Sequence, residues 1–190
     1  MAPPPAHIDA AATVEQGAVI GEGSRVWALT QVRRGARIGA DCVIGAGVMV
    51  DVDVVIGDRC KVQSGALLFR GVRLADGVFI GPGAVLTNDR HPRAVAPDGT
   101  PLTAADWQLS PIDVGEGASI GANATVVAGV RIGAWAMVGA GAVVAHDVPA
   151  HGLVAGVPAR QMGWVCACGE RAQGAGEIVC GVCGRRFTAG

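Results

Sequence analysis

The stretch QVRRGARIGADCVIGAGVMVDVDVVI, residues 31–56, repeats one feature every six residues. A branched aliphatic residue stands at Val32, Ile38, Ile44, Val50 and Ile56. A period of six matches neither the roughly 3.6-residue period of an amphipathic helix nor the alternation of a simple strand. It is typical of a solenoid in which each hexad forms one flat side of a coil.

The period extends on both sides of this stretch. From residue 8 onward, steps of six meet only branched aliphatic residues: Ile8, Val14, Ile20, Val26, Val32, Ile38, Ile44, Val50, Ile56, Val62, Leu68, Leu74, Ile80 and Leu86. Six more follow in a new register: Val114, Ile120, Val126, Ile132, Val138 and Val144. At three sides per coil and about 4.8 Å per coil, these hexads predict about seven coils and a prism roughly 32 Å long.

A second column of residues stands four positions after each aliphatic residue except Leu86, where the rhythm stops, and holds nothing larger than valine. Such residues fit the tight inside of a corner. Cys42 and Cys60 belong to this column, so we interpret both as core residues and not as nucleophiles. Glycine directly follows many of the aliphatic residues, where it allows unusual backbone angles or close approach at a corner.

Composition narrows the classes of function. A formal net charge of −1 over 190 residues offers no basic field for nucleic acid. No run of about 18 apolar residues exists, so no membrane span is predicted. The first residues, MAPPPAHIDA, have neither the basic region nor the apolar core of a signal peptide. We therefore expect a cytoplasmic protein that binds its ligands at discrete sites.

The six-residue rhythm stops at TNDRHPRA, residues 87–94. Four prolines oppose regular strand before the rhythm resumes: Pro92, Pro97, Pro101 and Pro111. A long loop in so regular a domain is usually functional. We expect residues 87–113 to project from the prism and to carry the site. The alternative is a solvent loop closed by an Asx-turn at Asn88.

The last residues contain two close pairs of cysteines, each pair followed by glycine: Cys166, Cys168, Cys180 and Cys183. This pattern resembles a zinc ribbon. Four thiolates suit a tetrahedral structural zinc, and so short a segment cannot bury enough core to fold without such a staple. Unligated thiols and disulfides are the alternatives.

His146 and His151 have an H-x-x-x-x-H spacing that suggests a zinc site like that of a carbonic anhydrase. Such a site needs a third histidine on a facing coil. The hexads of the prism from Val14 to Val138 supply none. We therefore reject this interpretation.

Three segments carry a resemblance to a known family: RVWALTQVRRGARIGADCVIG (25–45), GVFIGPGAVLTNDRHPRA (77–94) and GASIGANATVVAGVRIGAWAMVGAGAVVAHDVPAHGLVAGVPARQMGW (117–164). The repeat resembles the left-handed β-helix of the hexapeptide-repeat acyltransferases. The elements TN-x-x-x-PR and GVPAR-x-x-GW are similar to those of enzymes that N-acetylate amino sugars carried on a nucleotide diphosphate. The resemblance implies an all-β fold, a left-handed parallel β-helix of hexapeptide repeats.

The chain then divides into three parts. We expect an N-terminal extension at 1–7, the β-helix acyltransferase domain at 8–160 with its projecting loop at 87–113, and a small C-terminal zinc-ribbon-like tail at 161–190.

The function implied by the resemblance is acetyl transfer from acetyl-CoA to the amino group of a UDP- or dTDP-linked 3-amino sugar. Relatives acting on UDP-linked amino-uronic acids usually read WH where this chain has Trp27-Ala28, and often have an acidic residue in place of Arg70. The pair Asn88-Asp89 is closer to relatives that use dTDP-linked amino-deoxy sugars. An acyltransferase for another small acceptor and a non-catalytic trimeric scaffold are the alternatives.

The family assembles as homotrimers with active sites between subunits, and its loop reaches the sugar site of a neighbour. This implies that Asn88 lies beside the reacting amine, while His91 is the candidate base by residue type. An exposed histidine without a role is the alternative for His91. Val127, Trp135 and Met137 are apolar beyond the interior set, and we expect them to share one face that packs in the trimer.

The resemblance also implies the remaining contacts. Substrate-binding candidates are Asp89, Arg93, Phe69 and Arg70. Candidates for binding coenzyme A are Gly121, Asn123, Gly139 and Arg160. A backbone N–H at the corner 121–123 is a candidate donor to the developing oxyanion. Arg160 is a candidate partner for phosphate, or else a surface cation.

Overall fold

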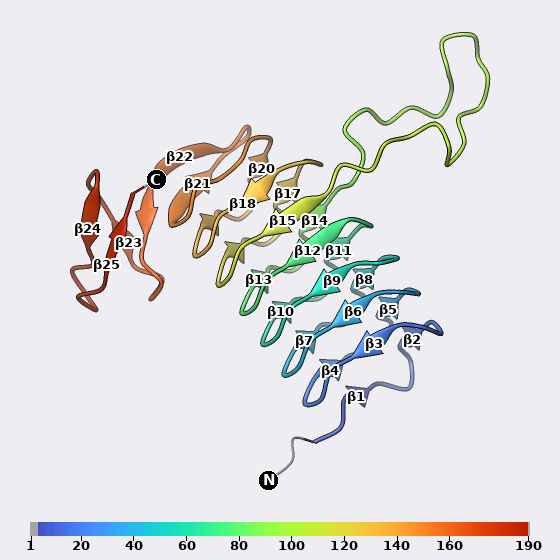
Figure 1. Cartoon of the computed structure of the whole chain (residues 1–190), viewed down its shortest axis with the longest axis horizontal. Coiled ribbons are helices and arrows are strands. Elements are labelled where there is room, and N and C mark those ends of the chain that lie inside the picture. Colours follow the sequence, from blue (N-terminus) through green and yellow to red (C-terminus); the bar gives the residue numbers. More distant parts are fainter. Residues whose placement is uncertain (1–3, 190) are drawn as a thin grey trace.

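Parallel β-strands wind into a three-sided prism in the computed structural model, which describes residues 4–189 (Figure 1). Residues 1–3 of the predicted N-terminal extension and Gly190 of the predicted tail lie outside the described residues. Within residues 4–189 the regular elements are strands, and none is a helix long and apolar enough to cross a membrane. The predicted all-β fold of stacked coils is therefore confirmed.

Each side of the prism is one sheet. The first sheet stacks β1 (His7–Ile8), β4 (Arg25–Val26), β7 (Val43–Ile44), β10 (Lys61–Val62), β13 (Phe79–Ile80), β16 (Ser119–Ile120), β19 (Met137–Val138) and β21 (Gly152–Ala155). The second stacks β2 (Thr13–Val14), β5 (Gln31–Val32), β8 (Met49–Val50), β11 (Leu67–Leu68), β14 (Val85–Leu86), β17 (Thr125–Val126) and β20 (Val143–Val144). The third stacks β3 (Val19–Ile20), β6 (Arg37–Ile38), β9 (Val55–Ile56), β12 (Val72–Leu74), β15 (Ile112–Val114) and β18 (Arg131–Ile132).

Every third hexad stacks on the same side of the prism, so Val62 pairs with Ile80 in the next coil. Ile80 then pairs with Ile120, although the whole loop lies between them in the sequence. The loop is therefore inserted without shifting the register of the stack. The second sheet has 7 strands, in agreement with about seven coils, and β21 begins one coil more.

The inward aliphatic residues of the two registers form one continuous core. Ile44, Leu68, Ile80 and Ile120 are fully buried, whereas Ile8 in the first coil is exposed. The small column is buried as well, and its polar members bond between coils. Ser24 Oγ donates to Gly39 O at 2.7 Å. One coil further on, Cys42 Sγ donates to Gly57 O at 3.1 Å, and in the coil after that Cys60 Sγ donates to Ala75 O at 3.1 Å. Both cysteines are buried core residues, as predicted.

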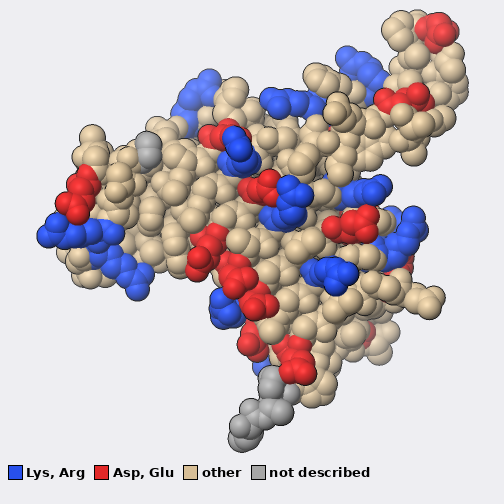
Figure 2. All heavy atoms as spheres, in the orientation of Figure 1, with Lys and Arg blue, Asp and Glu red and all other residues tan. Residues whose placement is uncertain are grey.

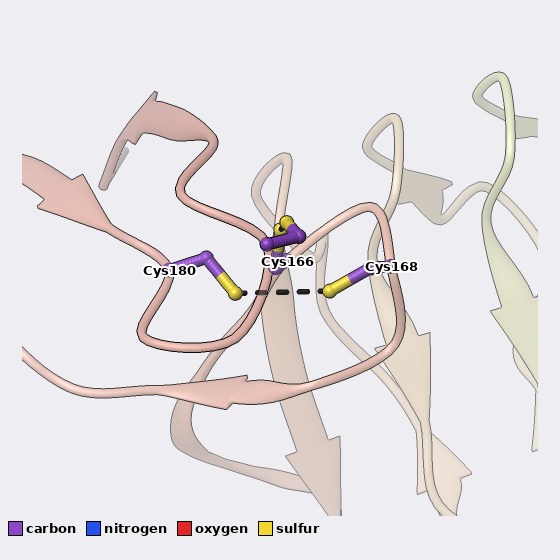
Figure 3. A group of neighbouring side chains, drawn as sticks. Cys166, Cys168 and Cys180 are labelled. Carbon is purple, nitrogen blue, oxygen red and sulfur yellow. Dashed lines mark hydrogen bonds between the residues drawn. The ribbon is translucent and has the colours of Figure 1, made fainter.

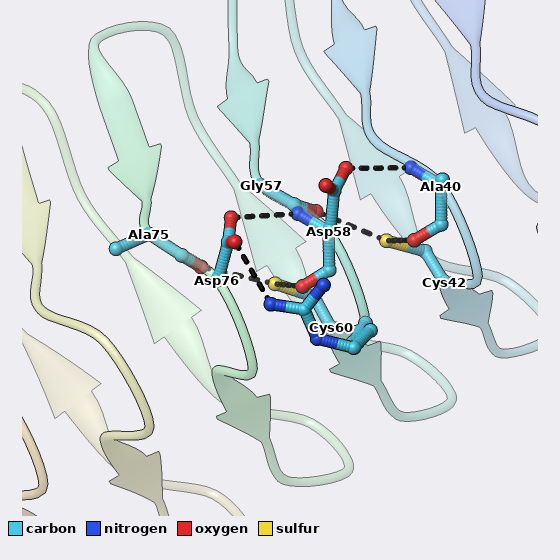
Figure 4. A network of polar contacts seen from close by, with 8 residues as sticks. Ala40, Cys42, Gly57, Asp58, Cys60, Ala75 and Asp76 are labelled. Atoms are coloured by element: carbon cyan, nitrogen blue, oxygen red, sulfur yellow. Dashed lines mark hydrogen bonds and ion pairs between the residues drawn. The ribbon is translucent and has the colours of Figure 1, made fainter.

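The corner between the third and first sheets shows why glycine follows the aliphatic residue (Figure 4). Asp76 Oδ1 accepts the Asp58 N–H at 3.0 Å, and Asp58 Oδ1 accepts the Ala40 N–H at 2.8 Å. A Cβ atom on Gly57 would stand 2.8 Å from the Ala75 carbonyl carbon, which is inside contact distance. Glycine is required there because the next coil occupies the place of a side chain.

The outward residues correct one prediction. Val127 follows β17 of the second sheet, whereas Trp135 precedes β19 and Met137 lies in it, in the first sheet. These three residues therefore do not share a face. The outward row of the second sheet is instead the one without a charged residue. Four of its residues are apolar and half-buried, namely Met49, Leu67, Val85 and Val143, and the other three are Thr13, Gln31 and Thr125. On the face that Figure 2 shows, by contrast, acidic and basic side chains are interleaved.

The chain beyond β21 turns back and continues the first sheet. β22 (Arg160–Val165) pairs antiparallel with β21, and β23 (Arg171–Ala172) pairs antiparallel with β22. A separate hairpin follows, formed by β24 (Glu177–Val179) and β25 (Arg186–Thr188). The tail lies at the C-terminal end of the prism, whereas the loop projects from its side between β14 and β15 (Figure 1).

One prediction concerns the neighbours Val55 and Ile56 of β9. Ile56 points inward and is 2% exposed, whereas Val55 points outward and is 39% exposed. Ile56→Ala should lower the free energy of unfolding by about 2–5 kcal/mol, because it leaves a cavity in a close-packed core. Val55→Ala should cost less than about 1 kcal/mol. Urea denaturation of both variants compares them, and equal losses would contradict the assignment of faces.

Candidate active site

The loop is anchored firmly where it leaves the prism. The Thr87 N–H donates to Val126 O at 3.1 Å. The Thr87 hydroxyl accepts the Ala128 N–H at 2.8 Å and lies 3.1 Å from Val126 O. These bonds continue the coil spacing up to the first residue of the loop. The side chains that follow therefore start from a fixed point.

The returning limb of the loop is held at two places. The Ser110 N–H donates to Asn88 O at 3.1 Å, which closes the base of the loop. Leu109 covers Gly71, where a Cβ atom would stand 2.9 Å from Leu109 Cδ1. Neither Leu109 nor Ser110 was predicted from the sequence to belong to the site. Only the glycine at the facing corner, together with the coil register, could have indicated this contact.

Between the two limbs lies a hollow of about 750 Å³. Its outgoing limb supplies four predicted site residues, Asn88, Asp89, His91 and Arg93, together with Arg90. The returning limb supplies Leu102, Thr103, Ala104, Asp106, Trp107, Gln108 and Ser110. The hollow thus combines cationic, acidic and amide groups with one aromatic ring. Such a lining suits a polar ligand that carries both charge and a flat ring.

Asn88 and Asp89 differ in what their side chains do. Asp89 Oδ1 accepts the His91 N–H at 2.8 Å, so the Asx-turn of this loop is at Asp89 and not at Asn88. Within residues 4–189 the Asn88 side chain has no such local bond, and it lines the hollow half-buried. Its amide is therefore free to serve a ligand as donor and acceptor.

The returning limb has its own fixed turn. Asp106 Oδ2 accepts the Thr103 hydroxyl at 2.7 Å and the Thr103 N–H at 2.8 Å. These two bonds, the hydroxyl's first, lower the pKa of Asp106. The carboxylate therefore stays ionised near neutral pH and holds one wall of the hollow. The T-x-x-D pattern could have indicated this turn from the sequence.

Phe69 and Arg70 lie one coil before the loop, at the same corner. The Phe69 N–H donates to Leu86 O at 3.3 Å, directly before the loop begins. Arg70 stands one coil before Asn88, but its Nη2 pairs with Asp53 Oδ2 at 3.3 Å. Neither residue lines the hollow. The structure thus brings them to the base of the loop and not into the hollow.

The four candidates for binding coenzyme A gather at another corner, between the first and second sheets. Gly121 and Gly139 are one coil apart, and Asn123 lies in the same turn as Gly121 with a positive φ of 54°. A Cβ atom on Gly139 would meet Ala155 Cβ at 3.0 Å, and Ala155 pairs with Arg160. The second sheet separates this corner from the corner that carries the loop.

A further hollow of about 800 Å³ lies along the third sheet, but none of the predicted site residues lines it. Its charged groups already pair with one another. Arg73 Nε lies 2.6 Å from Asp113 Oδ1, and Arg131 Nη2 lies 3.1 Å from Asp147 Oδ2. The Arg131 N–H is the main cause of the lowered pKa of Asp147. This surface is therefore a weaker candidate than the loop.

The four cysteines of the tail come together (Figure 3). Their sulfur atoms all lie within 4.8 Å of one another, the one group among residues 4–189 with such a set of metal-ligating atoms. Cys166 Sγ lies 3.5 Å from Cys183 Sγ, and Cys168 Sγ lies 3.7 Å from Cys180 Sγ. The N–H groups of Cys183 and Val182 lower the pKa of Cys180 to about 6. His146 and His151 belong to no such group.

Comparison with known proteins places this fold in a family. The family described as Bacterial transferase hexapeptide (six repeats) matches residues 17–52, 35–70 and 111–146. The matched residues, 17–70 and 111–146, therefore carry the repeat of these hexapeptide transferases. Within that class it is similar to sugar N-acetyltransferases.

One such relative is the dTDP-3-amino-3,6-dideoxy-alpha-D-galactopyranose 3-N-acetyltransferase of Aneurinibacillus thermoaerophilus. It is 40% identical over 74 residues, which are 39% of this chain and 38% of the relative. The chain therefore spans well under half the length of that relative.

Two solved structures share the fold. A mutant GDP-perosamine N-acetyl transferase from Caulobacter crescentus, in complex with CoA and GDP-perosamine, superposes with a TM-score of 0.54 and 28% identity, over 85% of this chain and 58% of that one. The acetyltransferase domain of PglB from Neisseria gonorrhoeae, in complex with acetyl coenzyme A, superposes with a TM-score of 0.52 and 27% identity, over 83% of this chain and 58% of that one. Here too the chain spans less than two thirds of the relatives.

The contact between Leu109 and Gly71 generates a prediction about the loop. Leu109→Ala should loosen the returning limb, so the Ser110 amide, which bonds to Asn88 O, should exchange its hydrogen at least about tenfold faster. Leu102→Ala is the matched control, because Leu102 is 38% exposed and Leu109 39%. Hydrogen exchange measures both variants. Unchanged exchange in Leu109→Ala would show that this contact does not hold the loop.

Proposed function

We propose that the chain transfers the acetyl group of acetyl-CoA to the amino group of a nucleotide-linked amino sugar. The observation that carries this proposal is the hollow of the loop, where Asn88 lies among Asp89, His91 and Arg93. The relatives support it, since they are named as sugar N-acetyltransferases and one is in complex with CoA and a nucleotide sugar.

The chemistry assigns roles to these residues. The amine nitrogen must lose a proton and attack the thioester carbon; the C–S bond then breaks, and the departing thiolate takes up a proton to give free CoA. The Asn88 amide can orient the amine without itself titrating. His91 can relay the proton, or bound water can do so. A backbone N–H at the corner 121–123 is the proposed donor to the oxyanion.

The proposed acceptor is a dTDP- or UDP-linked 3-amino sugar. Arg90 and Arg93 place two cationic side chains in the hollow, beside the carboxylates of Asp89 and Asp106, and such cations can bind a diphosphate. Trp107 offers a flat surface to a base or a sugar ring. The dTDP-linked form is favoured by the relative that acts on a dTDP-linked 3-amino sugar. Phe69 and Arg70 would then contact the substrate from the base of the loop.

Coenzyme A is proposed to bind along the other corner. Gly121 and Gly139 lie one coil apart there, and Asn123 and Arg160 offer polar groups at the same corner. A side of the prism holds about six residues at roughly 3.3 Å each, so the two corners are on the order of 20 Å apart in one chain. One chain therefore does not bring the acetyl group to its own loop, and a second chain is needed.

A homotrimer with sites between subunits meets this need. The outward row of the second sheet carries no charged residue and is apolar at four positions, and the loop exposes Val95, Leu102 and Trp107. Exposed apolar groups on a projecting arm are typical of surfaces that a partner covers. A cytoplasmic location belongs to the same proposal, because acetyl-CoA and nucleotide-linked sugars are made there. The structural zinc proposed for the tail takes no part in the transfer.

The roles of Asn88 and His91 can be separated. Asn88→Ala should lower turnover by about one to three orders of magnitude, the scale of losing a positioned polar group. His91→Ala should cost about tenfold or less, if proton removal does not depend on one side chain. Release of free CoA thiol, measured with a panel of nucleotide-linked 3- and 4-amino sugars and with serine, gives the rates.

Asp98→Ala is the control, since Asp98 is on the loop but does not line the hollow. A nearly silent Asn88→Ala beside an inactive His91→Ala would reverse the two roles. Turnover with serine alone would favour another acceptor. Failure to bind acetyl-CoA at all would leave the trimeric scaffold as the function.

The assembly has its own test. Val85→Lys places a charge in the outward row of the second sheet, so it should convert the trimer to monomers and remove activity. Val55→Lys, on the third sheet, should leave both unchanged. Light scattering at micromolar concentration measures the molar mass of the assembly that each variant forms. A fully active monomer would contradict the proposed assembly.

A further inference from the structure

The last coil of a β-helix has an unprotected side. Parallel strands stack from β1 to β21, and an open β21 would present unpaired backbone groups to other chains. β22 covers this edge, with Gly152 opposite Trp164 and Val154 opposite Gln161. β23 then extends the sheet by one more strand. The segment after β21 is therefore a cap on the end of the prism.

This cap has almost no core of its own. Val165 and Ile178 are buried, but Val179 and Val182 are exposed. A segment of about 30 residues with so few buried aliphatic groups does not offset the conformational entropy that it loses on folding. The remaining buried groups in the cap are two of its cysteines, Cys166 and Cys180.

The sulfur atoms have the spacing of a metal site. A tetrahedron with Zn–S bonds of about 2.3 Å has edges of about 3.8 Å between its sulfur atoms. Cys166 Sγ and Cys183 Sγ are 3.5 Å apart, Cys168 Sγ and Cys180 Sγ are 3.7 Å apart, and all four sulfur atoms lie within 4.8 Å of one another. A disulfide needs about 2.05 Å, and it would join the sulfur atoms in twos instead of gathering all four.

The cap contacts the prism through His151. The Val165 N–H donates to His151 O at 2.8 Å, and His151 Nδ1 lies 2.9 Å from Val165 O. The imidazole also stacks on Phe187 of the hairpin, with ring centroids 4.3 Å apart. Val165 directly precedes Cys166, and Phe187 lies shortly after Cys183 in the sequence. Both residues of the cap that contact His151 are therefore close in sequence to one of the four cysteines.

We propose that one zinc ion binds Cys166, Cys168, Cys180 and Cys183, and that this ion holds β22–β25 in place as the cap of the last coil. Four sulfur ligands leave no open position on zinc, so its role is structural. The free energy of binding becomes free energy of folding for the cap, because the separated thiols of an unfolded tail do not form the site. This role lies outside the transfer reaction and does not depend on it.

The test uses the full chain, purified without chelator. Elemental analysis should give about one zinc per chain, and cobalt substitution should give the intense visible absorption of tetrahedral cobalt thiolate. The double variant Cys180→Ser/Cys183→Ser should lose the metal. Its Val165 and Cys166 amides should exchange at least about tenfold faster, and trypsin should cut after Arg171, Arg185 and Arg186.

Cys42→Ser is the matched control. Ser24 already fills the equivalent place one coil earlier and makes the same bond to a carbonyl, so this variant should keep both the fold and the zinc. Chelation of zinc from the unmodified protein provides a second route, in case the double variant does not fold. Absence of zinc would overturn the site. Loss of zinc without faster hydrogen exchange of the Val165 amide would contradict the proposal that zinc holds the cap in place.

Discussion

The close stacking of each coil on the next is the constraint on which the rest of this structure depends. Backbone groups bond from coil to coil, as where the Val43 N–H donates to Cys60 O at 2.9 Å. That spacing leaves no room for a side chain at Gly57 and room for only a small one at Cys42. The interior then takes one aliphatic residue from each side. The whole hexapeptide pattern follows from this geometry, because each side must satisfy it again.

The fold could be predicted from the six-residue period, because each side of every coil places one aliphatic residue in the interior. The same period hides which outward residues share a face. Successive hexads lie on different sides of the prism, so only every third hexad shares a side, and Val127, Trp135 and Met137 were wrongly grouped for this reason. Within the loop, residue types indicated only the side chains of the outgoing limb that line the hollow, namely Asn88, Asp89, His91 and Arg93. The contact of Leu109 with Gly71 depends on the stacking of a distant coil, which residue type does not indicate.

The two groups of candidate site residues are arranged on different corners of the prism. Each corner is built by backbone stacking and is therefore rigid, and the second sheet lies between them. This separation is the reason that the proposed transfer needs two chains. In the proposed trimer, two prisms packed side by side would present one corner from each chain to a shared cleft. The cap, at the end of the stack, is independent of that cleft (Figure 1).

The loop leaves and rejoins the stack without disturbing it. Phe79 still pairs with Ser119 as Lys61 pairs with Phe79, as though the intervening loop were absent. Doubling the length of such an excursion costs only about 0.6 kcal/mol in closure entropy. Mutation can therefore lengthen, shorten or rewrite this segment while the coils keep their stability. In evolutionary terms the prism can stay constant, and the excursion is a part that selection can exchange when a lineage adopts a new acceptor.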